Sequence, residues 1–418
     1  MKIPFNTPGR RGPIVALAAV VAIAYAGMAA SQFAASWLGG RPELASLKRA
    51  AWLDPSDADH RDHLGRYFDL VARDPAAAVR EYSAAVQLNP LSARYWFDLA
   101  NSYQILGDTA GQTAALEHAI KADHMTPDVA WEAANLYLVQ GENEKALHEF
   151  RVVIANDPSL EAVALQFCWR IEPDVDAMLR DVVPARADAL TAFLTLLESK
   201  QETAGAEKVW NALMQTNQSL EPRYAYDYIR YLIQHKEVDQ AVLAWQQTAN
   251  RLGLTSYLPS ATNLIVNGNF NFKVLNAGFD WQYQKLSSVT LTLDPSDFHA
   301  GRRSLQITFD GPGIDEAGIY QLVAVQPNTT YDFTAYYKSG EMEGAGGPHF
   351  TIQDMYSQSV YYESDELKDA GFWKSANGEF TTSADCKLVV LHIRRLPAGS
   401  PMRGKLWVGD FHLARKPS

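Results

Sequence analysis

Three patterns of apolar and polar positions follow one another along the chain of 418 residues. Residues 14–38 form an apolar run without a charged residue. The next region, residues 42–252, contains pairs of segments whose apolar positions recur every three or four residues, which is typical of amphipathic helices. From residue 262 onward, short runs of alternating apolar and polar positions are separated by turn residues, as in β-strands. The pattern predicts an apolar helix, a helical region, a linker over residues 253–261 and a β-rich region.

The apolar run is long enough to cross a membrane. A helix of 25 residues at ~1.5 Å per residue spans the ~30 Å hydrocarbon core of a bilayer. The head, residues 1–12, holds three basic residues and no acidic one, which favours a cytoplasmic N-terminus. We therefore expect residues 13–38 to be a single-pass inner-membrane anchor, with the bulk of the chain in the periplasm. A cleaved signal peptide is the alternative, with a small-residue site at Ala24-Tyr25-Ala26.

Proline-containing boundaries recur through the helical region. Pro55 and Pro90 are 35 residues apart, and Pro158 follows Pro90 after 68 residues, which is two intervals of 34. Proline closes a unit because it cannot continue a helix. The boundaries delimit three units in register, at residues 58–90, 93–124 and 127–158.

These units share small, large and aromatic residues at matching positions. Small residues let two antiparallel helices approach closely, and aromatic residues fill the gap to the next pair. The residues in question are Leu64, Gly65, Phe68, Trp96, Leu99, Ala100, Tyr103, Ala134, Tyr137, Ala146 and Phe150. The pattern resembles the tetratricopeptide repeat, which implies a stack of helix pairs that binds proteins on a concave surface and has no catalytic chemistry. Two further, degenerate pairs are expected over residues 186–251.

The β-rich region predicts an antiparallel β-sandwich or jelly roll over residues 262–418, with about ten short strands. Representative strand-like runs are residues 289–293, 304–309, 319–325, 330–338, 350–354, 387–394 and 405–412. The predicted fold class is therefore a transmembrane helix, then an α-helical solenoid, then a C-terminal antiparallel β-sandwich.

Several segments of the sandwich resemble carbohydrate-binding modules of the galactose-binding-like jelly-roll type. They are NLIVNGNF at residues 263–270 with GFDW at 278–281, HAGRRSL at 299–305, YQLVAVQP at 320–327 with YDF at 331–333, FW at 372–373, and LWVGDF at 406–411. The resemblance implies a domain that binds a glycan. Their order along the chain, more than any one segment, carries the resemblance.

Such modules often hold a structural calcium ion near the first and last strands. The usual acidic positions of the opening motif are here Asn269 and Asn271, and only Asp410 keeps a carboxylate. Calcium prefers several oxygen ligands that include carboxylates. We therefore predict no cofactor, with Asp410 as a weak calcium candidate.

Strand alternation separates the predicted core from an outward set that could hold a sugar. The outward candidates are Tyr336, Gln353, His392 and Arg394, with Tyr361 and Tyr362 in a nearby loop. An aromatic ring can stack on a pyranose, and Gln and Arg side chains can bond paired hydroxyls. An ordinary solvated face is the competing interpretation. The tryptophans at positions 281, 373 and 407 are expected in the core.

Charge and composition narrow the classes of function. The net charge is −11, and residues 13–261 carry it, with 20 Lys and Arg against 31 Asp and Glu. An acidic chain argues against nucleic acid as the main partner. Two cysteines, Cys168 and Cys386, exclude a disulfide scaffold. Because no nucleophile elbow, phosphate loop, dinucleotide fingerprint or His-Glu-x-x-His motif occurs, we expect no enzyme.

Together these features predict a membrane-anchored extracytoplasmic adaptor. Its repeats would bind proteins, and its jelly roll would bind a glycan or another envelope component, in bacterial polysaccharide or cell-envelope assembly. The alternative is an assembly scaffold that makes only protein contacts and whose jelly roll binds no sugar.

Overall fold

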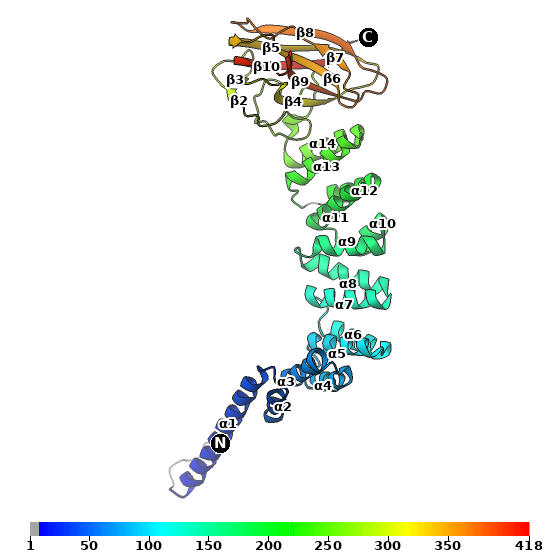
Figure 1. The fold of residues 1–418 in the computed structure, drawn as a ribbon, viewed down its shortest axis with the longest axis vertical. Helices are drawn as coiled ribbons and strands as arrows, with labels where there is room; N and C mark the ends of the chain where they lie inside the picture. The colour runs from blue at the N-terminus through cyan, green and yellow to red at the C-terminus, as the bar shows by residue number, and fades with distance from the viewer. Residues whose placement is uncertain (1–7, 217, 418) are drawn as a thin grey trace. The chain divides into compact units, whose positions relative to one another are not determined.

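The computed structural model describes residues 8–216 and 218–417, with side chains from residue 12 onward. Helices form the first part of the chain and strands the last (Figure 1), which confirms the predicted fold class. The chain divides into two compact units, Met1–Leu196 with Lys208–Leu213, and Leu197–Glu207 with Met214–Ser418. The division falls within the helices, ahead of the predicted linker. Most of the predicted basic head lies outside the described residues.

A long apolar helix, α1 (Pro8–Gly39), opens the described chain. Over Gly12–Gly39 it contains an 18-residue window with a mean hydropathy of 2.2, none of which is buried. Its C-terminal end differs, because Ala35 is fully buried and the Ser31 hydroxyl donates a 2.9 Å hydrogen bond to the Leu53 carbonyl of the next helix. By length and composition, α1 suits either a membrane anchor or a signal peptide.

Thirteen further helices of the α type follow within the described residues. Their bounds are α2 (Leu44–Leu53), α3 (Ala58–Arg66), α4 (Pro75–Leu88), α5 (Ala93–Leu106), α6 (Thr109–Ala122), α7 (Pro127–Gln140), α8 (Asn143–Asn156), α9 (Glu161–Ile171), α10 (Val175–Ala177), α11 (Ala187–Lys200), α12 (Thr203–Gln215), α13 (Pro222–Gln234) and α14 (Val238–Leu252). Two π-helical turns, η1 (Tyr67–Ala72) and η2 (Met178–Val182), and a 3₁₀ turn, η3 (Thr255–Tyr257), complete the helical elements.

Local sequence signals set the helix ends. The side chains of Asp57, Asp74 and Asp108 accept hydrogen bonds from backbone N–H groups at the starts of α3, α4 and α6. Helices α5 and α7 end at Gly107 and Gly141, which adopt the left-handed conformation with φ of 73° and 78°. Glycine is favoured there because it has no Cβ to clash.

The residues of the predicted repeat pattern lie mainly between the paired helices of the first unit. Leu64, Gly65, Leu99, Ala100, Ala134, Tyr137, Ala146 and Phe150 are buried, and Phe68, Trp96 and Tyr103 are half-buried. Gly65 shows why one position is small, since a Cβ there would lie 2.5 Å from the ring of the buried Tyr82 on α4. Phe68 belongs to the π-helical turn η1 rather than to a regular helix.

Among the described residues of the second unit, ten strands form two antiparallel sheets of five strands each. Their bounds are β1 (Gln282–Tyr283), β2 (Val289–Asp294), β3 (Ser304–Gly311), β4 (Glu316–Ala324), β5 (Thr330–Glu343), β6 (Gly347–Asp354), β7 (Val360–Glu363), β8 (Lys374–Thr381), β9 (Leu388–Leu396) and β10 (Met402–Arg415). The strand orders are β1-β4-β9-β6-β7, called the front sheet here, and β2-β3-β10-β5-β8, called the back sheet.

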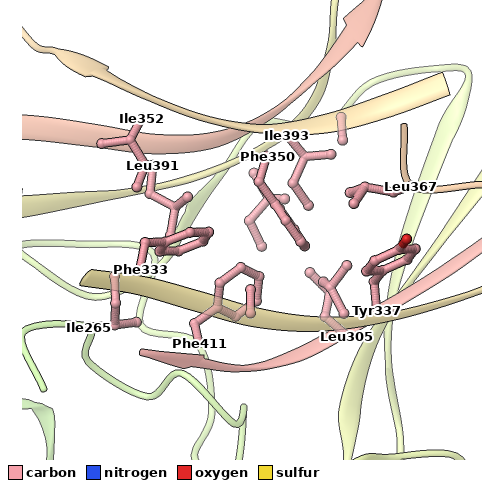
Figure 2. Close-up of a cluster of buried hydrophobic side chains, with 14 of the residues drawn as sticks. Ile265, Leu305, Phe333, Tyr337, Phe350, Ile352, Leu367, Leu391, Ile393 and Phe411 are labelled. Atoms are coloured by element: carbon pink, nitrogen blue, oxygen red, sulfur yellow. The ribbon is translucent and has the colours of Figure 1, made fainter. Parts of the chain in front are cut away.

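Apolar side chains from both sheets fill the space between them (Figure 2). Phe350 and Leu391 of the front sheet face Phe333 and Phe411 of the back sheet, so rings and aliphatic chains interdigitate. Gln321 is one of the buried polar residues of the sandwich. The buried Gln321 accepts from the Val266 N–H at 3.0 Å and donates to the Val266 carbonyl at 2.8 Å. These two bonds attach the segment that precedes β1 to strand β4. Both polar atoms of Gln321 are thereby satisfied.

Within the second unit, helices α13 and α14 pack directly against the sandwich. The Trp245 indole is 1% exposed, lies 6.4 Å from the Phe279 ring and donates to the Tyr257 carbonyl. A Cβ on Gly278, whose φ is +59°, would lie 2.3 Å from this indole. Only glycine combines that backbone conformation with so close an approach. The predicted linker is thus itself packed against α14.

Candidate functional site

A cavity of about 390 Å³ lies between α13 and the outer surface of the front sheet, entirely within the second unit. Its volume is at the low end of the range of ~300–1,000 Å³ that is common for small-molecule sites. The front sheet contributes residues from β4, β9 and β6, and α13 contributes one face. Polar side chains that line the cavity include those of Tyr226, Arg230, Glu316, Tyr320, Gln353 and His392.

The sheet side of the cavity follows from strand alternation. On β9, Val389, Leu391 and Ile393 enter the core, so His392 points to the opposite face of the sheet. The pairing of Tyr320 with His392, and of His392 with Thr351, brings polar side chains of three strands side by side. The Tyr320 hydroxyl donates a 3.0 Å hydrogen bond to the Gln282 side chain on β1. Hydroxyl, amide and imidazole groups are therefore gathered on one surface.

His392 and Glu316 contact each other on this surface. Nδ1 of His392 lies 3.4 Å from a Glu316 carboxylate oxygen, and the imidazole is 4% exposed. The hydrogen bond from His392 lowers the pKa of Glu316, and the positive charge of Arg394 acts in the same direction. Nε2 of His392 and the Thr351 hydroxyl have no hydrogen-bond partner among the described residues. Buried polar atoms are usually satisfied. Of these two residues only His392 lines the cavity, so its imidazole is the group suited to a ligand hydroxyl, whereas Thr351 is 0% exposed and lies outside the lining.

Two of the predicted sugar-binding residues, Gln353 and His392, line the cavity. Both were expected on an open face, yet each is less than 9% exposed because α13 lies over the sheet at this point. Arg394 is on the same face of β9 and pairs in register with Glu316, but it is outside the cavity lining.

Tyr336 does not belong with the other candidates. It lies on β5 of the back sheet, so the sandwich core separates it from Gln353 and His392. Its ring stacks on His299 with 3.6 Å between centroids. The expected outward set is therefore divided between the two sheets, because strand alternation assigns a residue to a face of its own sheet without identifying the sheet.

Tyr361 and Tyr362, expected to line a nearby loop, instead lie on strand β7 and are outside the cavity. Tyr361 stacks on Phe380 of β8, and Tyr362 packs on Phe333. The Tyr362 ring also covers Gly378, where a Cβ would lie 2.0 Å from it. These tyrosines close the side of the sandwich where β7 approaches β8.

Of the three tryptophans expected in the core, Trp281 is there and the other two are not. Trp373 and Trp407 are half-buried, and their indole N–H groups donate to Asp297 and Asp294 at 3.0 and 2.8 Å. An indole N–H needs an acceptor when it is buried. The acceptors are the carboxylate of Asp294 at the end of β2 and that of Asp297 in the loop that follows.

Sequence reasoning missed the contribution of α13. Tyr226, Ile229, Arg230, Ile233 and Gln234 recur at intervals of three, four, seven and eight residues and line the cavity together. That spacing marks one face of a helix. This spacing is visible in the sequence. It did not indicate a site, because an amphipathic helix in a repeat is expected to bury its apolar face against neighbouring helices.

The oxygens around the opening motif have partners within the chain. Asn269 accepts from the Asn271 N–H, Asn271 accepts from the Arg302 N–H, and the Asp410 carboxylate contacts His299 at 3.1 Å. The Arg303 guanidinium donates to the backbone carbonyls of Phe270 and Asn271, each at 2.6 Å. The positively charged Arg303 side chain thus binds two backbone carbonyl oxygens of this segment.

We predict that Arg303 stabilises this segment without metal. Replacing Arg303 by Met should lower the free energy of unfolding of the sandwich by about 2–3 kcal/mol, because two buried carbonyls lose charged donors. Addition of a chelator or of calcium chloride should leave the unfolding of the unmodified full chain unchanged in calorimetry. A rise in melting temperature on adding calcium would contradict this prediction.

Comparison with known proteins gives a family match for part of the chain and structural similarities for both its β-rich and its helical parts. Residues 262–397 match the family described as "Carbohydrate binding domain". Similar solved structures include one on "CBM4 structure and function" (16% identity, 36% of this chain and 99% of that one, TM-score 0.28), MamA (21%, 38% and 88%, 0.29) and PilF of Pseudomonas aeruginosa (18%, 55% and 95%, 0.27). No curated protein matches the sequence significantly.

Proposed function

We propose that this chain is a membrane-anchored adaptor that binds a glycan in the cavity on the front sheet and binds proteins through its helical pairs. The match of residues 262–397 to a carbohydrate-binding family carries the proposal, and the cavity supplies the place where a sugar would bind. In this proposal α1 is the anchor, located in an inner membrane, and the rest of the chain acts in the periplasm in polysaccharide or envelope assembly.

The chemistry of the cavity supports a sugar as its ligand. Vicinal hydroxyls of a pyranose both donate and accept hydrogen bonds, as do the amide of Gln353 and the hydroxyls of Tyr226 and Tyr320. The aliphatic side chains of Leu322 and Val390 lie beside them and suit the apolar face of a sugar ring. A mixture of amides, hydroxyls and aliphatic surface is typical of sites for small polar ligands.

The same lining supports binding rather than hydrolysis. Glycoside hydrolysis ordinarily uses two carboxyl groups about 5–10 Å apart across the scissile bond. Among the described residues that line the cavity, Glu316 is the only acidic one. Its carboxylate is already hydrogen-bonded by His392 and has a lowered pKa, which does not suit a general acid.

The helical pairs offer a surface for a protein partner, and the tetratricopeptide resemblance supports this role. On α3 and α5, Arg66 contacts Asp98 at 2.9 Å and Arg94 contacts Asp59 at 2.8 Å. The hydroxyl of Tyr95 donates to the same Asp59 at 2.6 Å. Charged side chains that pair with one another keep this surface hydrophilic, so recognition there would be polar and sensitive to salt.

Binding of the full chain in detergent to an array of bacterial and plant polysaccharides tests the proposal. We expect binding to at least one neutral glycan, and we expect Gln353→Ala to weaken it at least tenfold by removing an amide that lines the cavity. The matched control is Gln306→Ala, because Gln306 lies on the outer face of the back sheet. Absence of binding to every glycan would overturn the sugar-binding role and favour the scaffold that makes only protein contacts.

A further inference from the structure

Helix α13 presents a continuous face to the front sheet. Ile229 and Ile233 are buried, Tyr226 is half-buried, and the side chains of Arg230 and Gln234 remain exposed beside them. All five line the cavity together with β4, β6 and β9. A molecule in the cavity therefore lies between a helix and a sheet rather than on an open sheet surface.

Specific contacts within the second unit hold α13 in this place. The Tyr356 hydroxyl donates a 2.8 Å hydrogen bond to the Ile233 carbonyl at the end of α13, and the Lys236 ammonium lies 5.5 Å from the Tyr356 ring. The neighbouring helix α14 is attached as well, through an ion pair of Asp239 with Lys387 at 2.5 Å and through the Trp245 indole against Gly278. These contacts attach the pair α13 and α14 to the sandwich.

The ionisable groups on the two walls already have partners within the protein, which bears on the class of ligand. Arg230 from the helix is paired with Asp227 at 2.9 Å, and Glu316 from the sheet is paired with His392. Most of the remaining polar groups are neutral. They comprise five glutamines, Gln234, Gln282, Gln284, Gln353 and Gln358, and the hydroxyls of Tyr226 and Tyr320. Amides bond hydroxyls without favouring a charged sugar.

We infer that α13 is one wall of the glycan site and that this site takes the end of a neutral glycan chain, or a short neutral oligosaccharide, rather than the interior of a long chain. The inference rests on the proposed function. The helix lies opposite the sheet, and the cavity between them has a volume of only about 390 Å³. It therefore has room for a few sugar residues. The last helical pair thereby becomes part of the ligand site.

Calorimetric titration of the full chain in detergent tests this inference. The probes are neutral β-1,4-linked xylose, glucose and galactose oligosaccharides of three and six residues. For the series that binds, we expect the trisaccharide and the hexasaccharide to have affinities within about twofold of each other, because additional residues lie outside the cavity. An affinity that keeps rising with length, or binding of none of these six probes at millimolar concentration, would overturn the inference.

Substitutions on the helix separate this inference from the proposed function. We expect Arg230→Ala and Tyr226→Ala each to weaken binding at least tenfold. The control is Arg223→Ala, because Arg223 is a similarly exposed arginine of α13 outside the cavity. If Gln353→Ala weakens binding and the α13 variants do not, the sandwich binds alone and the inference fails while the proposed function stands. If none of the three affects binding, both fail.

Discussion

Replacing Trp245 by Ala should lower the free energy of unfolding of the second unit by about 3–5 kcal/mol, the usual cost of deleting a buried tryptophan. The indole is 1% exposed and lies against Gly278, Phe279 and Tyr226. The surrounding backbone cannot collapse into the vacated space, because Gly278 adopts a left-handed conformation in a tight segment. The Tyr257 carbonyl also loses the donor of a 3.0 Å hydrogen bond.

Hydrogen–deuterium exchange of the full chain in detergent, read in peptides from α14 and from the front sheet, measures this effect. Both sets of peptides should lose protection together, since the indole joins them. The control is Trp52→Ala, because the Trp52 side chain is 78% exposed and its removal should change stability by less than about 0.5 kcal/mol. Loss of protection in α14 alone would show that the helical pair and the sandwich unfold independently.

The second large effect concerns pH. Burial raises the pKa of Asp280 from 3.8 to about 6, although the Leu275 N–H donates to the carboxylate at 2.7 Å and opposes the shift. A carboxyl whose pKa is higher in the folded state favours folding below its unfolded pKa, and this contribution disappears as the pH rises through the folded value. For this shift the contribution is about 3 kcal/mol in total, of which about 2 kcal/mol is lost between pH 4 and pH 7.

The difference between the unmodified chain and Asp280→Asn isolates this group from the other carboxyls. Asn keeps an oxygen for the Leu275 N–H and cannot ionise, so the variant should gain about 2 kcal/mol relative to the unmodified chain between pH 4 and pH 7. Urea unfolding followed by hydrogen exchange in the sandwich gives the two curves. Asp310→Asn, at an exposed position on β3, is the matched control, and equal pH dependence of both variants would contradict the prediction.

Much of the fold could be predicted because its signals are local. Proline spacing and small residues such as Gly65 mark the helical pairs, and alternation in the run that contains Phe333 separates core from surface on each strand. Trp281 was correctly placed in the core. Each of these inferences needs only a periodicity and the knowledge of what a helix or a strand buries.

The candidate site was only partly predictable, because it depends on which surfaces meet. Gln353 and His392 were identified as outward-facing, but nothing in their own strands indicates that α13 covers them. Tyr336 satisfied the same alternation rule and lies on the other sheet. Arg230 belongs to a helix of the repeat region, so sequence order places it in a different domain from the residues it adjoins. Long-range packing of this kind leaves no local pattern.

The packing of α13 on the front sheet has a consequence for how this protein can be divided. A fragment that begins at residue 262, where the composition changes, would remove the helix and uncover Leu322 and Val390, which are 6% and 8% exposed in the intact chain. Adjacent exposed aliphatic side chains favour self-association. The smallest piece that keeps the cavity whole begins ahead of Pro222, so α13 and the sandwich must be transferred together when the domain is moved to another protein.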